Sequence, residues 1–397
     1  MISKKKGDKK MSDIEISKDI RYVGCQDYDL DLFEGQYIIP NGVSYNSYVI
    51  LDEKIAIMDT VDARKSEEWL DNVQKELNGK KPDYLVIHHM EPDHSATIEK
   101  LVDLYPEVEV VSSAMAFNMM KQFFPNMVVN KKVVKENDEL VLGKHTLVFV
   151  AAPSVHWPEV LFSYEKSEKI LFSADGFGKF GTLDYEDLEG WACEARRYYF
   201  NIVGKFGSFV QKVLAKAAKL EINMILPLHG PILKEDLGYY IHLYDIWSSY
   251  RAEEPGIFIA YTSVYGNTKK IAEILADKLK VTGVKVAISD LARDDLAECV
   301  EDAFRYDRMI CLSPTIDGGM FPMMETFLSH LKAHSYQNRT VALVENGTWA
   351  PMAAKAMKSV FDSMKDITIC ENIVSIKSAY NPSYEAKLDA LVAELTK

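Results

Sequence analysis

The chain has 397 residues, of which 48% are hydrophobic and 26% charged, a globular composition with room for two or three domains. Its net charge of −13 disfavours nucleic acid as a partner, because phosphate binding requires a basic face. The sequence has no apolar run long enough to span a membrane and no secretory signal, so a cytoplasmic protein is predicted. The lysine-rich residues 1–13 are expected to form a flexible tail. Five widely spaced cysteines indicate neither a disulfide framework nor a cysteine metal site.

Residues 14–252 alternate short strands with helical patterns, which predicts a layered α/β domain with much antiparallel pairing. Strands are predicted at 36–39, 45–51, 54–59, 84–88, 146–151, 160–164 and 170–173, and helices at 67–77 and 95–104.

Potential metal ligands concentrate where these strands end. The predicted strand 84–88 leads into six residues that contain four of them, and further candidates follow later apolar runs: His89, Glu91, Asp93, His94, His156, Asp175 and His229. Each residue alone is equally typical of a hydrogen-bonded core position. Together, their mutual repulsion and desolvation would be relieved by a cation, and strand ends are rigid places from which loops converge. The seven side chains are therefore predicted to form one metal site.

The other histidines receive no such role. His88 is expected to point to the opposite side of its strand from His89, and His145 lies in a predicted turn. His242, His330 and His334 are left unassigned.

A turn-rich segment at 251–256 separates the first domain from a second one, residues 253–397. Here strands and helices alternate, which predicts a doubly wound parallel sheet. The strands are predicted at 257–261, 284–288, 309–312 and 341–344, and the helices at 268–280, 352–364 and 388–395, the last capped by Ser383.

Three loops after these strands are candidates for binding a cofactor. The first opens directly into a helix, where hydroxyls and backbone N–H groups can hold a phosphate, although a capped turn would have a similar sequence. It resembles the flavodoxin phosphate loop and lacks the motifs of ATP or NAD sites, which favours FMN. Trp349 is a candidate neighbour of the flavin ring. The loop residues are Thr262, Ser263, Val264, Tyr265, Gly266, Asn267 and Thr268; Ser313, Pro314, Thr315, Ile316, Asp317 and Gly318; and Asn346, Gly347, Thr348, Trp349 and Ala350.

The ligand pattern and the phosphate loop, in this order, resemble the flavodiiron proteins over nearly the whole chain. The resemblance implies a metallo-β-lactamase-like αββα domain followed by a flavodoxin-like domain. It also implies two irons, one held by His89, Glu91 and His156, the other by Asp93, His94 and His229, with Asp175 bridging them. In some relatives the histidine matching His94 does not bind metal. Hydrolases of the same fold usually have His where Glu91 stands, and three carboxylates among seven ligands favour iron.

By the same resemblance, electrons pass from a rubredoxin-type donor through FMN to the di-iron centre, which reduces dioxygen to water or nitric oxide to nitrous oxide. A head-to-tail homodimer, or a dimer of such dimers, is implied as well. The preference between the two gases and the identity of the donor stay open. Two alternatives remain: a zinc hydrolase fused to a flavodoxin domain, and a flavodoxin-like electron carrier with an inactive first domain.

Overall fold

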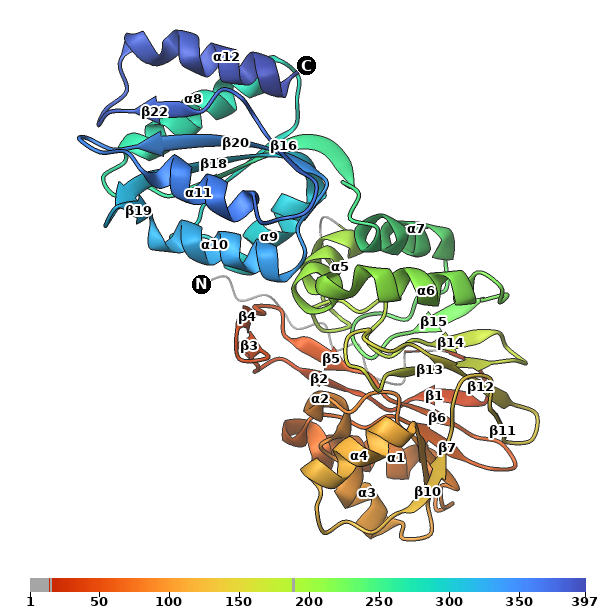
Figure 1. Ribbon diagram of the computed structural model, residues 1–397. Coiled ribbons are helices and arrows are strands. Elements are labelled where there is room, and N and C mark those ends of the chain that lie inside the picture. The colour runs from red at the N-terminus through yellow and green to blue at the C-terminus, as the bar shows by residue number, and fades with distance from the viewer. Residues whose placement is uncertain (1–13, 15, 188–189) are drawn as a thin grey trace. The chain divides into compact units, whose positions relative to one another are not determined.

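The computed structural model describes residues 14, 16–187 and 190–397, and the predicted basic tail at 1–13 lies outside them. The chain divides into two units (Figure 1). The first unit runs to Tyr198 and includes Ser208–Tyr244; the second unit comprises Tyr199–Gly207 and Asp245–Lys397. Among the described residues, no helix combines the length and apolar character needed to cross a membrane.

The first unit contains two larger sheets that pack face to face, with helices outside each of them (Figure 1). One sheet has the order β1 (Ile20–Tyr22), β6 (Tyr48–Ile50), β7 (Ala56–Met58), β8 (Tyr84–Val86), β9 (Glu109–Ser112), β10 (Asn130–Val133). The other has the order β11 (Glu139–Val141), β12 (Thr146–Ala151), β13 (Leu161–Glu165), β14 (Ile170–Phe172), β15 (Met224–Leu226). Helices α1 (Ser66–Leu77), α2 (Pro92–Ser95), α3 (Ile98–Leu104) and α4 (Ala114–Phe123) cover the first sheet, and α5 (Trp191–Tyr198), α6 (Gly207–Ala217) and α7 (Leu237–Ser248) cover the second.

Apolar side chains from both sheets form one core between them. Tyr48 of β6 and Phe172 of β14 meet edge to face at 5.6 Å, and Val86, Phe149 and Leu161 belong to the same buried cluster. Two small antiparallel pairs complete the unit: β2 (Cys25–Asp27) with β5 (Val43–Tyr45), and β3 (Leu32–Phe33) with β4 (Tyr37–Ile38). The predicted αββα arrangement is therefore confirmed.

Two predicted elements of the first unit are divided in the structure. The expected strand 45–51 is interrupted at Asn46, because the Asn46 backbone N–H donates to the Leu228 carbonyl at 2.8 Å instead of continuing a ladder, and its side chain donates to the carbonyls of Pro227 and Gly230. The expected helix 95–104 starts only at Ile98, after a separate turn of helix, α2. The hydroxyl of Thr97 at this break donates to the Val61 carbonyl at 2.9 Å.

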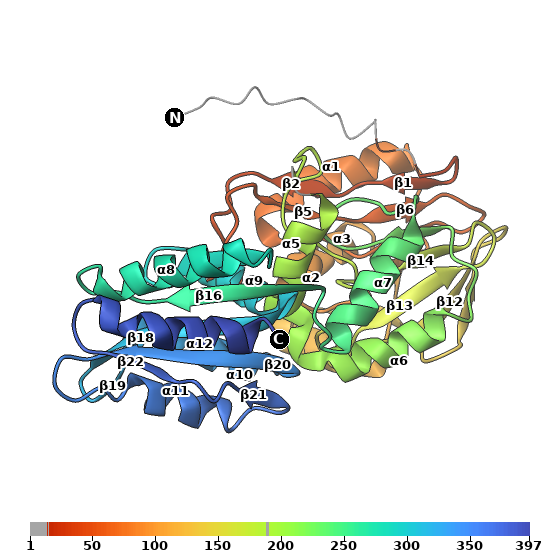
Figure 2. The same cartoon turned by 90° about the horizontal axis from the view of Figure 1, so that it is seen from above.

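The second unit is built on a parallel sheet in the order β17 (Val286–Asp290), β16 (Glu254–Tyr261), β18 (Tyr306–Ile316), β20 (Arg339–Asn346), β21 (Ile367–Ile369). The strand β22 (Val374–Ile376) extends the pairing of β20, and β19 (Gly319–Met320) forms a hairpin with β18. Helices α8 (Asn267–Val281) and α12 (Glu385–Leu395) cover one face, the side seen in Figure 2, and α9 (Leu296–Arg305), α10 (Pro322–Ala333) and α11 (Ala353–Phe361) cover the other. This confirms the predicted doubly wound sheet, in the flavodoxin-like strand order.

One predicted detail of this unit is wrong. Ser383 does not cap the terminal helix, because a short 3-10 turn, Pro382–Tyr384, precedes α12. The side chain of Asn381 caps that turn by accepting a hydrogen bond from the Ser383 N–H. Pro382 fixes the first position of the turn, so the capping residue must stand before it.

A buried arginine, Arg339, bonds to several backbone carbonyls of the second unit, and we expect it to be critical for the stability of the protein. The Arg339 guanidinium donates to the backbone carbonyls of Tyr250, Arg251, Phe304, Tyr306, Gln337 and Asn338. Arg339→Leu would leave these acceptors without their donor and should lower the free energy of unfolding by about 3 kcal/mol in urea titrations. Arg293→Leu, at an exposed surface pair with Asp290, is the control and should change it by less than about 0.5 kcal/mol. Equal stabilities for the two variants would contradict the assignment.

Candidate metal centre and flavin crevice

Loops from both sheets of the first unit bring the seven predicted ligands together. His89 and Glu91 follow β8, and the short helix α2 carries Asp93 and His94. The other three follow β12, β14 and β15: His156, Asp175 and His229. Their ligand atoms form two adjoining groups, each within 4.8 Å: His89, Glu91, His156 and Asp175 in one, and Asp93, His94 and His229 in the other.

Asp175 lies between the two groups and turns one oxygen toward each. Its Oδ2 is 3.4 Å from His89 Nε2 and 3.2 Å from His156 Nε2. Its Oδ1 is 3.2 Å from His94 Nε2 and 3.8 Å from His229 Nε2. A carboxylate in this position can bridge two cations.

The remaining carboxylates each face the imidazoles of one group. Glu91 Oε2 is 3.0 Å from His156 Nε2 and 3.3 Å from His89 Nε2. In the other group, Asp93 Oδ2 is 3.2 Å from His229 Nε2 and 3.3 Å from His94 Nε2. The His94 ring therefore points its Nε2 into the same space as the other six ligands.

The protein itself does not satisfy these converging atoms, and this fits a pair of metal ions. His89 and His229 each use Nδ1 as a hydrogen-bond donor, to Glu159 at 2.8 Å and to the Ser44 carbonyl at 2.7 Å, which leaves each Nε2 as a lone pair. His229 Nε2 lies only 3.0 Å from His94 Nε2. Both carboxylate oxygens of Asp93 and of Asp175 are buried and find no hydrogen-bond donor among the described residues. Lone pairs that face one another in a buried space are stabilised by cations.

When no metal is bound, protonated imidazoles supply the positive charge that balances the carboxylates of the centre. Burial opposes ionisation of Asp175, but the imidazoles of His89, His156 and His94 outweigh it and hold its pKa well below the usual value. Burial likewise opposes a charge on His89, yet Asp175, Glu159 and Glu91 hold its pKa well above the usual value. Asp175 is therefore held in its ionised form.

Sequence reasoning did not identify the residues that support these ligands. Glu159 accepts from His89 Nδ1 and from the Met90 N–H, and it stands three residues after His156 in the same loop. Its nearness to His156 in the sequence does not reveal this role, because the partner of Glu159 is His89, 70 residues away. At the mouth, a cavity of about 310 Å³ is lined by Phe33, Glu34, Glu91 and Asp93 among others. Burial, with the neighbouring Glu91 charge, raises the pKa of Glu34 to about 7.

Two of the histidines left out of the predicted site, His88 and His145, have other partners. The His88 ring bonds to Asp59 and Ser163, away from the partners of His89, as expected. His145 bonds to Asp52 and Glu168, and Lys144 pairs with Glu168 in turn.

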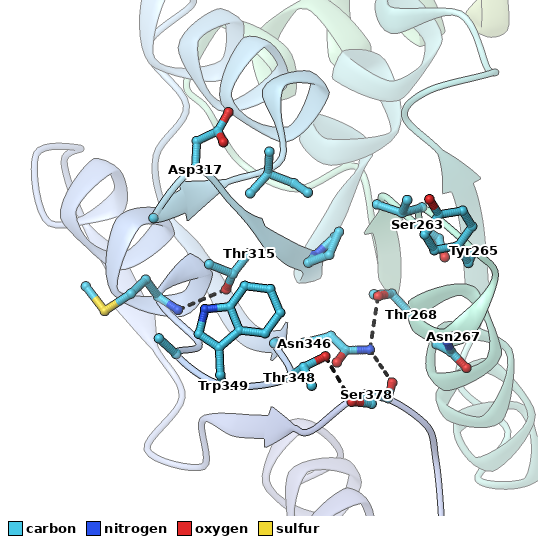
Figure 3. A pocket seen from close by; sticks show the side chains of 17 residues that line it. Ser263, Tyr265, Asn267, Thr268, Thr315, Asp317, Asn346, Thr348, Trp349 and Ser378 are labelled. Carbon is cyan, nitrogen blue, oxygen red and sulfur yellow. Dashed lines mark hydrogen bonds between the residues drawn. The ribbon is translucent and has the colours of Figure 1, made fainter.

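In the second unit, a crevice of about 510 Å³ opens at the carboxyl ends of β16, β18, β20 and β22 (Figure 3). It is lined by the predicted loop residues Ser263, Val264, Tyr265, Asn267, Thr268, Pro314, Thr315, Ile316, Asp317, Gly318, Asn346, Gly347, Thr348, Trp349 and Ala350. Thr262, Gly266 and Ser313 do not line it: the two hydroxyl residues are fully buried behind it, 3.5 Å apart, and Gly266 caps α8. Met352 and Ser378 line it without having been predicted.

Two features suit this crevice to a flavin phosphate. Gly266 adopts a left-handed conformation and α8 has no side-chain cap, so the N–H groups of its first turn can face an anion. The Trp349 side chain is 88% exposed and lies across the crevice from Ser263 and Tyr265 (Figure 3). A flat aromatic ligand can stack there. Asn346 and Ser378 both line the crevice and are joined there, because the Asn346 side chain donates to the Ser378 carbonyl at 2.8 Å.

Comparison with known proteins agrees with both sites. Residues 43–230 match the ODP family beta lactamase model, and residues 258–392 match a flavodoxin domain model. The nitric oxide reductase of Moorella thermoacetica is 29% identical over 366 residues, which cover 90% of this chain and 92% of that protein.

Two solved structures have nearly the same fold over most of both chains. The flavodiiron protein from Giardia intestinalis has a TM-score of 0.90 and 26% identity, covering 96% of this chain and 94% of the other. The rubredoxin oxygen:oxidoreductase from Desulfovibrio gigas has a TM-score of 0.90 and 24% identity, covering 96% and 97%. The chain thus combines a beta-lactamase domain with a flavodoxin domain, and over most of its length it is similar to the flavodiiron proteins.

Proposed function

We propose that the protein reduces dioxygen to water, nitric oxide to nitrous oxide, or both, at a di-iron centre supplied with electrons through FMN. The observation that carries this proposal is the convergence of seven buried ligands, three of them carboxylates, around Asp175. Carboxylate-rich sites with imidazoles favour iron over softer metals. We assign His89, Glu91 and His156 to one iron, Asp93, His94 and His229 to the other, and Asp175 to both.

When bound, the irons would supply electrons to the gas and the FMN would relay them one or two at a time. The residues of the chain hold and orient these groups. Glu159 and the Ser44 carbonyl fix the tautomers of His89 and His229, so that both rings present a lone pair to metal. The cavity between Phe33 and Asp93 gives a small molecule a way to the ligands. We assign the metal site to a domain of residues 14–252.

We assign FMN to the crevice of the second domain, residues 253–397. The start of α8, with Asn267 and Thr268, offers backbone N–H groups and a hydroxyl to the phosphate. Trp349 would lie against the isoalloxazine ring, and Thr315 is held in place by accepting from the Met352 N–H at 2.9 Å. The size of the crevice is in the range usual for a cofactor site.

The proposals for the donor, the assembly and the location rest on the similarity to the flavodiiron proteins and on the cysteines. We propose a rubredoxin-type donor, because a structural relative is named as a rubredoxin oxygen:oxidoreductase. We also propose a head-to-tail homodimer, or a dimer of dimers, in which each flavin serves the metal centre of the partner. All five cysteines are free, and four of them are buried, which fits a reducing cytoplasm.

The test is metal and flavin analysis of the purified protein, followed by anaerobic reduction and exposure to each gas. We expect two irons and one FMN per chain, and rapid reoxidation by dioxygen or nitric oxide with release of water or nitrous oxide. Tightly held zinc with negligible iron, after expression with ample iron, would favour the hydrolase. A reducible flavin without metal and without gas turnover would favour the electron carrier.

A further inference from the structure

The ligands of the metal centre come from two different sheets, so the distance between the sheets sets the geometry of the site. His89, Glu91, Asp93 and His94 follow β8 of the six-stranded sheet. The other three ligands follow strands of the five-stranded sheet: His156, Asp175 and His229. A residue that holds the two sheets together beside the ligands would therefore control how well the two sets meet.

His88 occupies that position between the sheets. Its side chain is 1% exposed, and its Nδ1 lies 2.5 Å from Asp59 Oδ2, directly after β7 of the first sheet. Its Nε2 lies 2.8 Å from the hydroxyl of Ser163, on β13 of the second sheet. The His88 carbonyl also accepts from the Leu161 N–H at 3.0 Å, and the ring stacks on Phe172 of β14. One residue thus makes three polar or ring contacts with the opposite sheet.

Both nitrogens of the His88 ring have a hydrogen-bond partner when the imidazole is neutral. Nδ1 can donate to the Asp59 carboxylate while Nε2 accepts from the Ser163 hydroxyl. The arrangement has the order of a Ser-His-Asp triad, but Ser163 is fully buried and cannot meet a substrate. The chemistry of these groups is therefore structural.

We propose that His88 is a positioning residue, which sets the spacing of the two sheets and so the geometry of the metal ligands. This inference rests on the proposed metal site. His89 is the next residue along the chain, and its Nε2 faces Asp175 at 3.4 Å, so fixing the His88 ring between the sheets also fixes the backbone from which His89 reaches Asp175. The same Asp59 segment holds the far end of the ligand loop, because Thr60 donates to the His94 carbonyl through both its N–H and its hydroxyl.

The test replaces His88 with Gln, whose amide cannot span Asp59 and Ser163 as the two ring nitrogens do. Metal-free protein is titrated with Co²⁺, whose visible absorption reports on ligand geometry. For His88→Gln we expect Co²⁺ affinity to fall about 10-fold to 100-fold, with an altered absorption spectrum and unchanged flavin content. The control is Leu77→Ala, a buried position on α1, which should lower stability but leave both Co²⁺ readouts as in the parent.

Ser163→Ala is the second variant, because it removes only the Nε2 bond and changes little volume. It should shift Co²⁺ affinity in the same direction by a smaller factor. Parent-like Co²⁺ affinity and spectrum in either folded variant would overturn the role of His88, and so would equal losses in Leu77→Ala. If the parent protein itself fails to bind two Co²⁺ ions, the proposed metal site fails instead.

Discussion

Replacing Asp175 with Ala is expected to abolish gas reduction, by more than about 100-fold, while FMN stays bound. Even outer-shell residues of metal sites typically contribute 10-fold to 100-fold in metal affinity or activity, and Asp175 is placed to contact both metals. Its two oxygens are the ones that face the two ligand groups, at 3.2 Å from His156 and from His94. Without these two oxygens, no other carboxylate of the two described ligand groups faces both metal positions. Iron content per flavin and rates of gas consumption measure the effect.

Glu165→Ala is the matched control for this experiment. Glu165 is another fully buried carboxylate of the first unit, but it accepts hydrogen bonds from the Ser167 and Glu168 N–H groups and touches no ligand. Its loss should lower stability and leave the iron-to-flavin ratio and turnover as in the parent. Retained turnover in a folded, flavin-replete Asp175→Ala protein would remove Asp175 from the site.

The sequence predicted those parts of the fold and site that depend on local patterns. Four ligands within the six residues from His89 to His94 are visible without any knowledge of tertiary structure. Parallel strands end at one edge of a sheet, so the three loops of the flavin crevice could be placed together from strand order alone. The strand 146–151 was predicted with its observed bounds, because polar turn residues directly precede its apolar run.

What the sequence did not reveal depends on contacts between distant segments. Glu159 meets His89 across 70 residues, and a lone Glu carries no sign of such a partner. The strand is interrupted at Asn46 because the Asn46 backbone N–H bonds to the Leu228 carbonyl, a partner that only the folded chain brings within reach. Ser378 joins the flavin crevice through β22, a strand of three residues that is too short for a periodic signal.

Glu91→His tests why a carboxylate stands where related hydrolases usually have histidine. Glu91 Oε2 faces the imidazoles of His156 and His89 at 3.0 and 3.3 Å, and it is the sole carboxylate of its group apart from the shared Asp175. Replacing it removes one negative charge and leaves three imidazoles around that metal position. A softer and less anionic ligand set favours zinc over iron. We therefore expect the variant to bind less iron and more zinc, with gas reduction lowered about 10-fold or more.

The flavin serves as the internal control for this last experiment, because the crevice of the second unit contains no residue of the metal centre. Flavin content and its reduction by a rubredoxin donor should match the parent while metal content shifts. A zinc hydrolase would instead keep or gain hydrolytic activity on Glu91→His, and an inactive scaffold domain would show no change in metal. If the variant retains iron and reduces dioxygen or nitric oxide at the parent rate, the charge of Glu91 does not determine the choice of metal. The selectivity would then have to come from Asp93 and Asp175, the carboxylates that Glu91→His leaves in place.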